Sequence, residues 1–245
     1  MARQNTDAKN QLIGPDEFRE RIDGFFTQAA ADVYSLYEKH HEAMNAMDFD
    51  DLLMKVVLLF ERFPERLAHY QHSFRFVLID EYQDTNHAQY RLASLLAERH
   101  RNLAVVGDDD QSIYSWRGAD IRNILEFERD YPDAEVIRQE QNYRSTQCIL
   151  DVANAVVTCN RERKGKNLWT PRGPGALVQV VEVDDERAEA QFVASEVQKL
   201  LSGEAGDARP YRPDEIAVLY RTNAQSRALE EQFGRYAIGY QVIGG

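Results

Sequence analysis

Two short apolar runs, each followed directly by a polar turn, lie in the middle of the sequence. Residues 76–79 precede Asp80 and Glu81, and residues 103–106 precede a turn with three aspartates. Runs of four apolar residues are too short for helices and are typical of strands buried on both faces of a parallel sheet. Residues 86–99, which lie between them, show helical spacing. The pattern predicts a strand–helix–strand unit, in which ligands bind at the carboxyl ends of the strands.

The residues that follow these strands suit phosphate chemistry. In phosphate-loop nucleotide hydrolases, an Asp after an apolar strand holds Mg²⁺ and a neighbouring group activates the attacking water. Asp80 and Glu81 can divide this work, and Gln111 can bring an uncharged amide to the water or to the terminal phosphate. For an isolated Asp-Glu pair, helix capping or simple solvent exposure is the alternative, since short motifs carry a false-positive risk.

Three longer motifs occur in order along the chain. They are DEYQDTN at residues 80–86, GDDDQSIYSWRGAD at 107–120 and QNYRST at 141–146. These motifs resemble motifs II, III and IV of the superfamily 1 DNA helicases, in particular of the UvrD/PcrA/Rep group. The segments AKNQLIGPDEF, FDDLL, LYRTNAQSRALEE and YQVIGG are also similar to this family, so the resemblance covers essentially the whole chain.

The resemblance implies a site for ATP and Mg²⁺. By this likeness, Asp80 binds Mg²⁺, Glu81 activates the hydrolytic water and Gln111 senses the terminal phosphate. Tyr143 stacks on the adenine, and Arg144 neutralises the charge that develops on the phosphate. An arginine fork suits phosphate oxygens better than the point charge of a lysine.

The resemblance also implies contacts to single-stranded DNA. Tyr114, Trp116 and Arg117 are expected to contact the strand, and Arg221 and Asn223 are expected to contact it from the second motor domain. A flat indole can stack on any base, which suits binding without sequence preference. An ordinary core or surface aromatic is the alternative for Trp116 outside this motif.

Several family motifs have no counterpart in the sequence. No G-x-x-x-x-G-K-[ST] phosphate loop occurs, nor does the glutamine segment that precedes it in the family, nor motifs V and VI. We therefore expect the chain to be a central excerpt of a longer helicase. On its own it is expected neither to hydrolyse ATP efficiently nor to unwind DNA.

Composition limits the surface and the location of the protein. The net charge of −12 argues against a broadly basic nucleic-acid surface, but a translocating motor needs only a local groove of aromatic and arginine side chains. Cys148 and Cys159 lack metal-ligand spacing, and no signal peptide or run of eighteen apolar residues occurs. We expect no membrane partner and a cytoplasmic, nucleoid-associated location in a bacterium.

The predicted fold class is α/β, with parts of two RecA-like parallel-sheet domains and a helical insertion subdomain. The expected domains are part of the helical insertion at residues 1–48, the carboxyl part of the first motor domain at 49–139, and the amino part of the second motor domain at 140–245. Further strands are predicted at four apolar segments, residues 135–137, 177–183, 216–220 and 240–243.

The amino-terminal third is predicted to be helical. Residues 1–13 are polar and are expected to fray, whereas the apolar spacing of residues 15–41 predicts one long helix. Adjacent histidines point in different directions from a helix, so a solvated pair is favoured over a metal site for His40 and His41. Asp51 lies in the first turn of the next predicted helix, where a carboxylate complements the helix dipole.

The one basic stretch, RERKGKNLWTPRGP at residues 161–174, permits two interpretations. Basic runs with an aromatic can bind DNA, but they are more often solvated loops. We therefore expect a solvated loop, with DNA contact as the alternative.

The resemblance implies an ATP-dependent helicase that translocates 3′-to-5′ on single-stranded DNA and unwinds duplexes from single-strand/duplex junctions in DNA repair or replication. Three alternatives stay open. The chain can be a non-hydrolysing DNA-binding or interaction module, or the motor part of an AddA/RecB-type helicase–nuclease. A metal-dependent hydrolase that uses Asp80, Glu81 and residues 108–110 is disfavoured, because three successive aspartates in a turn point apart.

Overall fold

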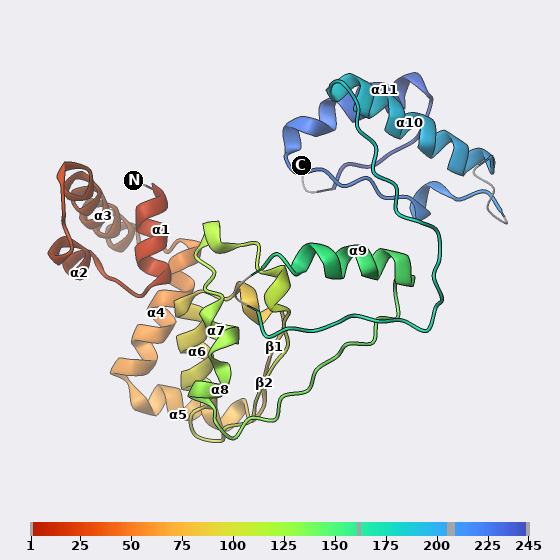
Figure 1. The fold of residues 1–245 in the computed structure, drawn as a ribbon. Coiled ribbons are helices and arrows are strands. Elements are labelled where there is room, and N and C mark those ends of the chain that lie inside the picture. Colours follow the sequence, from red (N-terminus) through yellow and green to blue (C-terminus); the bar gives the residue numbers. More distant parts are fainter. Residues whose placement is uncertain (1, 161–162, 205–208, 244–245) are drawn as a thin grey trace. The chain divides into compact units, whose positions relative to one another are not determined.

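The chain forms two compact units, Met1–Leu177 and Val178–Gly245, called here the first and second units. The computed structural model describes residues 2–160, 163–204 and 209–243 of them. Residues of the segments considered above that lie outside this range are Met1, Arg161, Glu162, Gly244 and Gly245. Figure 1 shows the helices and strands of each unit. The domain borders expected at residues 48 and 139 stay predictions.

The polar amino-terminal segment is a packed helix, so the prediction that it frays was wrong. Helix α1 (Ala2–Asn10) packs against α3 (Phe25–Met44) and α4 (Phe49–Arg62). Ala8 and Ile13 are buried with Tyr34 of α3, and the Tyr34 hydroxyl donates a 3.1 Å hydrogen bond to the carbonyl oxygen of Ile13. A few apolar side chains suffice to pack this helix, because polar side chains beside them form buried hydrogen bonds and ion pairs.

The long helix predicted over residues 15–41 is interrupted. Helix α2 (Pro15–Glu20) ends before α3 begins at Phe25. The Thr27 hydroxyl accepts a 2.9 Å hydrogen bond from the backbone N–H of Gly24, which is one half of a capping box. This contact starts a new helix. The apolar spacing of residues 15–41 therefore spans two helices and the turn between them.

Helices α4 and α5 (Pro64–Ser73) follow each other along the chain and pack against one another (Figure 1). Asp48 caps α4 by accepting a 2.8 Å hydrogen bond from the Asp51 N–H, and Pro64 occupies the first turn of α5. Buried residues from α4 and α6 (His87–Ala97) form the main apolar cluster of this region, Val57, Phe60 and Leu95. This cluster fixes α6 against α4.

The predicted strand–helix–strand unit is confirmed. Strand β1 (Val77–Ile79) pairs in parallel with β2 (Leu103–Val105), in the register Val77 with Leu103, and α6 connects them. The Asn86 side chain caps α6 by accepting a 2.9 Å hydrogen bond from the Gln89 N–H. The prediction that the strands are buried on both faces was wrong, however, since Leu78 is 77% exposed. Only one face of this small sheet packs against helices.

Short helical turns follow the two strands. They are the 3-10 turns Tyr82–Asp84, Asp109–Gln111 and Ser115–Arg117, and the short helices α7 (Arg122–Leu125) and α8 (Phe127–Asp130). The longer helix α9 (Gln147–Val157) comes later in the chain. The strand predicted at residues 135–137 does not form. Within the described part of this unit, the only pairing outside β1 and β2 is a single bridge between Gln141 and Trp169.

The second unit contains two packed helices, α10 (Glu186–Ser202) and α11 (Ser226–Arg235). The Asp185 side chain caps α10 by accepting hydrogen bonds from two backbone N–H groups. Among the residues described here, the strands predicted at 177–183, 216–220 and 240–243 are absent. Ile216 and Val218 instead pack on the buried cluster that the helices form around Phe233. The apolar alternation therefore reflects packing on helices without a partner strand.

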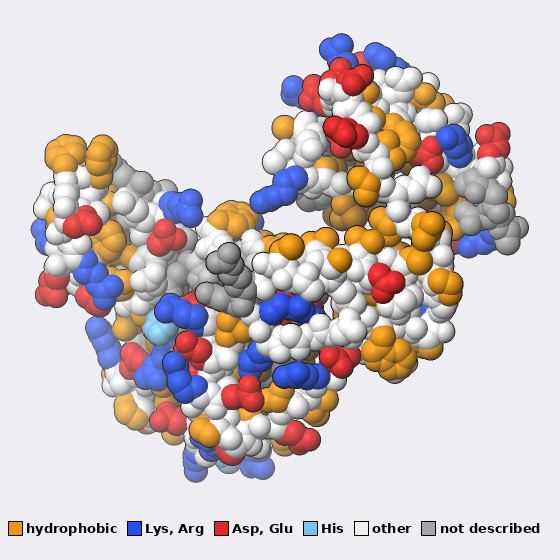
Figure 2. Space-filling view, viewed as in Figure 1, with side chains coloured by type: hydrophobic (Ala, Val, Ile, Leu, Met, Phe, Trp, Pro, Cys, Tyr) orange, Lys and Arg blue, Asp and Glu red, His pale blue; other side chains and the backbone are white. Residues whose placement is uncertain are grey.

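Charged side chains of both signs cover the surface. On the face shown in Figure 2, acidic and basic side chains intermingle over the lower part of the first unit and do not form a broad basic surface. This agrees with the expectation from the net charge of −12. Within the described ranges, no helix is both long and apolar enough to cross a membrane.

Candidate functional site

Asp80 and Glu81 follow β1 directly. The Asp80 Oδ1 atom accepts a 2.9 Å hydrogen bond from the Glu81 N–H, and both side chains are exposed. Glu81 has left-handed backbone angles, φ 51° and ψ 42°. Residues other than glycine seldom adopt this conformation, and those that do are concentrated at functional sites. The turn therefore presents two carboxylates at the carboxyl end of β1.

Gln83 links this turn to the one after β2, although the sequence analysis did not single it out. Its Nε2 donates a 2.7 Å hydrogen bond to Glu81 Oε2, and its Oε1 accepts a 2.9 Å hydrogen bond from the Asp108 N–H. The residue is only 1% exposed. A glutamine in a polar run carries no signal of burial, so only its position between two motif carboxylates could have pointed to it.

Gln111 ends the turn after β2. Its Nε2 donates a 2.7 Å hydrogen bond to Asp108 Oδ2, while Asp108 Oδ1 accepts one from the Asp110 N–H. A chain of hydrogen bonds therefore runs from Glu81 through Gln83 and Asp108 to Gln111. The two predicted nucleotide-contacting turns are joined in this way.

The acidic turn at residues 108–110 is matched by positive charge from the stretch after α9. Arg163 Nη2 lies 2.8 Å from Asp110 Oδ2, and Lys166 pairs with Asp108. Burial would raise the pKa of Asp108, but its contacts with Lys166 and Gln111 outweigh burial and hold the pKa below its usual value.

These ion pairs bear on two interpretations of the sequence, one for the acidic turn and one for the basic stretch. The three aspartates offer close carboxylate oxygens that could hold a metal ion, but Arg163 and Lys166 already supply the positive charge. A metal-dependent hydrolase built on this turn is therefore disfavoured. The expectation of a solvated basic loop was wrong for these two side chains, because both are largely buried against the acidic turn.

Tyr143 and Arg144 lie in a loop that is held by its backbone. The Asn142 side chain accepts hydrogen bonds from the N–H groups of Arg144, at 2.9 Å, and Ser145, at 2.7 Å. Arg172 donates to the carbonyl oxygens of Tyr143 and Arg144. The side chains of Tyr143 and Arg144 are exposed, and in the described structure no hydrogen bond or ion pair joins them to Asp80, Glu81 or Gln111.

One exposed cluster is formed by the side chains of Tyr114, Trp116 and Arg117. Their motif shows only that these residues are close in the sequence. The two ring centroids are 6.3 Å apart, and the Arg117 guanidinium lies 4.6 Å from the Trp116 ring centroid and 5.3 Å from that of Tyr114. Gly118 ends this turn with φ 87°, and a Cβ there would lie 3.3 Å from the Asn10 side chain. The cluster combines flat faces with a cation, which is suited to bases and phosphates.

Arg221 and Asn223 lie in the second unit, just before α11. Gln225 Oε1 accepts 2.9 Å hydrogen bonds from the N–H groups of both Arg221 and Thr222. The Asn223 carbonyl oxygen accepts a hydrogen bond from the Ser226 hydroxyl. The backbone of this turn is therefore fixed, while the side chains of Arg221 and Asn223 remain exposed.

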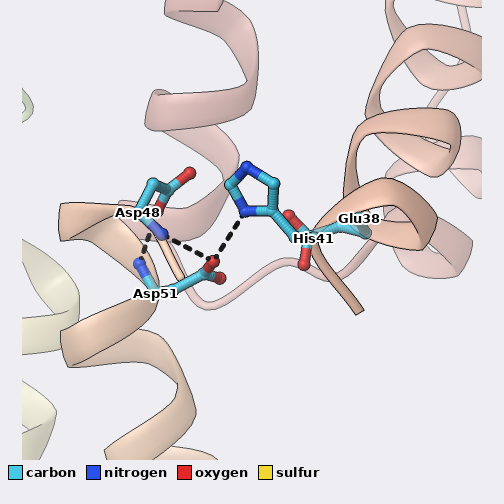
Figure 3. Close-up of side chains that lie close together, drawn as sticks. All are labelled: Glu38, His41, Asp48 and Asp51. Atoms are coloured by element: carbon cyan, nitrogen blue, oxygen red, sulfur yellow. Dashed lines mark hydrogen bonds and ion pairs between the residues drawn. The ribbon is translucent and has the colours of Figure 1, made fainter. Parts of the chain in front are cut away.

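A separate cluster of acidic residues lies between α3 and α4. Figure 3 shows Glu38 and His41 of α3 near Asp48 and Asp51 at the start of α4, with His41 directed at Asp51. Ligand atoms of these four residues lie within 4.8 Å of one another, which is close enough to hold a metal ion.

Lys9 supplies the buried positive charge of this cluster, and the more exposed Lys55 lies 3.4 Å from Asp51 Oδ2. The Nζ of Lys9 lies 2.6 Å from Glu38 Oε1, 2.8 Å from Asp48 Oδ2 and 2.9 Å from Asp51 Oδ1, and its side chain is 1% exposed. His41 Nδ1 lies 3.5 Å from Asp51 Oδ2 and its side chain is largely buried, so the prediction of a solvated side chain was wrong for His41. His40 is exposed, as predicted. The cluster is a buried ion-pair network that joins three helices.

Comparison with known proteins places the chain among helicases. The model of the UvrD/REP helicase N-terminal domain matches residues 1–132, and that of the UvrD-like helicase C-terminal domain matches residues 137–245. The ATP-dependent DNA helicase PcrA of Bacillus subtilis is 50% identical over 238 residues, which is 97% of this chain and 32% of that protein. PcrA of Staphylococcus aureus is 49% identical over 237 residues, with the same coverage of both chains. The chain spans about a third of the length of these relatives.

Proposed function

Because the chain belongs to the UvrD/REP helicase family, we propose that it forms part of the motor of an ATP-dependent DNA helicase. One observation supports this most strongly. The parallel pairing of β1 with β2 puts Asp80, Glu81 and the turn ending at Gln111 at the same edge of the sheet, and Gln83 joins them by hydrogen bonds. This is the edge at which α/β proteins bind ligands.

The residues after β1 fit a magnesium–nucleotide site. Exposed carboxylate oxygens are ligands that Mg²⁺ prefers, and among the described residues Asp80 Oδ2 makes no hydrogen bond. Mg²⁺ held by Asp80 would neutralise negative charge on the phosphates of ATP. Glu81 would accept a proton from the attacking water, and the Gln111 amide would contact the terminal phosphate.

Tyr143 and Arg144 complete the proposed nucleotide site. Tyr143 would stack on the adenine, and the Arg144 fork would neutralise charge on the transferred phosphoryl group. Both side chains are free at the surface of a loop whose backbone is fixed by Asn142 and Arg172. Their approach to Glu81 would require a closing movement, such as nucleotide binding produces in many enzymes.

The proposed DNA contacts come from two places in the chain. Tyr114, Trp116 and Arg117 form a preassembled aromatic and cationic cluster in the first unit. Arg221 and Asn223 are presented by a fixed turn in the second unit. Stacking on the aromatic faces would hold single-stranded DNA without reading its sequence.

The finer parts of this function are also proposals. We infer 3′-to-5′ movement, a preference for single-strand/duplex junctions, and a role in repair or replication at the bacterial nucleoid in the cytoplasm. The relatives named above are PcrA helicases, which favours a stand-alone helicase over a helicase–nuclease subunit.

The direct test uses the full-length product of the gene that encodes this chain. We expect Mg²⁺-dependent ATP hydrolysis that single-stranded DNA stimulates, and unwinding of a duplex with a 3′ tail in preference to one with a 5′ tail. Binding of single-stranded DNA without ATP hydrolysis would instead support the non-hydrolysing module. Preference for the 5′ tail would overturn only the proposed 3′-to-5′ direction of movement and would leave the helicase function in place.

Replacing Trp116 by alanine should weaken the binding of single-stranded DNA that stimulates ATP hydrolysis. Stacking on one base is worth about 1–3 kcal/mol, so the DNA concentration for half-maximal stimulation should rise by roughly 5- to 150-fold. Titration of the full-length protein with oligothymidylate measures this. Phe63→Ala is the matched control, because Phe63 is a similarly exposed aromatic, 48% against 54%, and follows α4 outside the cluster. An equal effect of both substitutions would remove the stacking role.

A further inference from the structure

We propose that Gln83 is a positioning residue for Glu81, and that its buried carboxamide sets the Glu81 carboxylate relative to the turn that carries Gln111. The inference rests on the proposed function, because it assigns to Glu81 the activation of water. It adds a residue that touches neither nucleotide nor water and acts through Glu81.

The two hydrogen bonds of the Gln83 amide determine its orientation. Nε2 donates to Glu81 Oε2 at 2.7 Å, and Oε1 accepts from the Asp108 N–H at 2.9 Å. If the amide were rotated by 180°, its oxygen would face the carboxylate oxygen of Glu81, and its NH2 group would face the N–H of Asp108. Neither pair could form a hydrogen bond. Only one orientation satisfies both partners, and the residue is buried, so the amide cannot turn to water instead.

Gln83 also lies in close contact with the turn after β2. A Cβ on Gly107 would lie 2.5 Å from Gln83 Oε1, so the glycine after β2 permits the close approach of this amide. The Ser112 hydroxyl donates to the Gln83 carbonyl oxygen at 3.3 Å. Gln83 is therefore held by both its backbone and its side chain between the turns after β1 and β2.

This arrangement restricts a carboxylate that is otherwise free. Glu81 is exposed, and its Oε2 is held by Gln83, so Oε1 remains available to a water molecule. The same amide binds the backbone of Asp108, whose side chain accepts from Gln111. A single side chain thus sets the relative positions of the group proposed to activate water and the group proposed to contact the terminal phosphate.

Gln71 shows what a buried glutamine with a purely structural role looks like in the same unit. Its Nε2 donates a 2.7 Å hydrogen bond to the backbone carbonyl oxygen of Leu95, and it joins α5 to α6 away from the candidate site. Both glutamines are buried and both bridge two elements. Only Gln83 uses its amide to hold an exposed, titratable side chain.

The test compares Gln83→Glu, Gln83→Met and the control Gln71→Met in the full-length gene product. Gln83→Glu keeps an acceptor for the Asp108 N–H but cannot donate to Glu81, whereas Gln83→Met loses both bonds. Loss of a residue that orients a reacting group typically costs about 10–100-fold in activity. We expect both Gln83 variants to lose kcat for ATP by this factor with KM nearly unchanged, and Gln71→Met to keep the wild-type kcat.

Combining Gln83→Met with Glu81→Gln separates positioning from stability. If Gln83 acts through Glu81, the double variant should hydrolyse ATP no more slowly in single turnovers than Glu81→Gln alone. Additive losses would overturn the proposal, as would a wild-type kcat in Gln83→Glu. Absence of hydrolysis in the wild-type protein would instead overturn the proposed function, so the two failures are distinguishable.

Discussion

Replacing Lys9 by methionine should destabilise the region formed by α1, α3 and α4 by about 3–5 kcal/mol, because it removes the buried counter-charge of three carboxylates. The remaining cation, Lys55, lies farther away, at 3.4 Å from Asp51 Oδ2, and is partly exposed. The Lys9 ammonium lies within 2.9 Å of carboxylate oxygens on Glu38, Asp48 and Asp51. Asp51 is fully buried, so water cannot take the place of the lost cation. Methionine fills a similar volume, so the loss reflects charge more than packing.

Hydrogen exchange in the full-length gene product measures this effect locally. Protection of α1 and of the start of α4 should fall on the order of 10²–10⁴-fold. Arg91→Met is the control in the same unit, since it removes an exposed ion pair with Glu61 that joins α6 to α4 and should cost at most about 1 kcal/mol. Unchanged protection in Lys9→Met would mean that the acidic residues are stable without Lys9.

The pH dependence of this effect has a definite sign. Burial raises the pKa of Asp48 and of Asp51, but the contacts with Lys9 and with backbone N–H groups outweigh burial and lower both. Carboxylates with a lowered pKa stabilise the fold above about pH 4, and that stability is lost as the pH falls through their lowered pKa. The difference in protection between wild type and Lys9→Met should therefore narrow in acid.

The burial of Lys9 and its ion pairs could not be predicted from the sequence, for a physical reason. It lies in a polar segment whose pattern predicts fraying, and nothing local marks it for burial. Its partners lie at Glu38, Asp48 and Asp51, on two other helices, and only tertiary packing brings them together. The same applies to Arg163 and Lys166, whose acidic partners lie more than fifty residues earlier in the chain.

The strand–helix–strand unit was predictable because its signals are local. A short apolar run, a capping Asn86 and a helical spacing suffice to place β1, α6 and β2, and parallel pairing then brings Glu81 and Gln111 to one edge. Strands in the second unit were wrongly predicted because alternation shows only which side chains are buried. At Ile216 and Val218 the burying surface is a pair of helices.

Replacing Glu81 by glutamine should leave ATP binding intact and reduce turnover on the order of 10²–10⁴-fold, because an amide cannot accept the proton of the attacking water. The substitution keeps the size of the side chain, and its amide oxygen can still accept the hydrogen bond from Gln83. Loss of turnover would therefore report on the chemistry of the carboxylate. Measurements of kcat and of the binding of a fluorescent ATP analogue separate the two effects.

Glu98→Gln is the matched control for this experiment. Glu98 is an exposed glutamate that follows α6, at the opposite end of that helix from the candidate site, so its replacement should change neither kcat nor nucleotide binding. Near-normal turnover in Glu81→Gln would show that another group activates the water. The strained backbone of Glu81 and its bond to Gln83 would then serve only to shape the turn after β1.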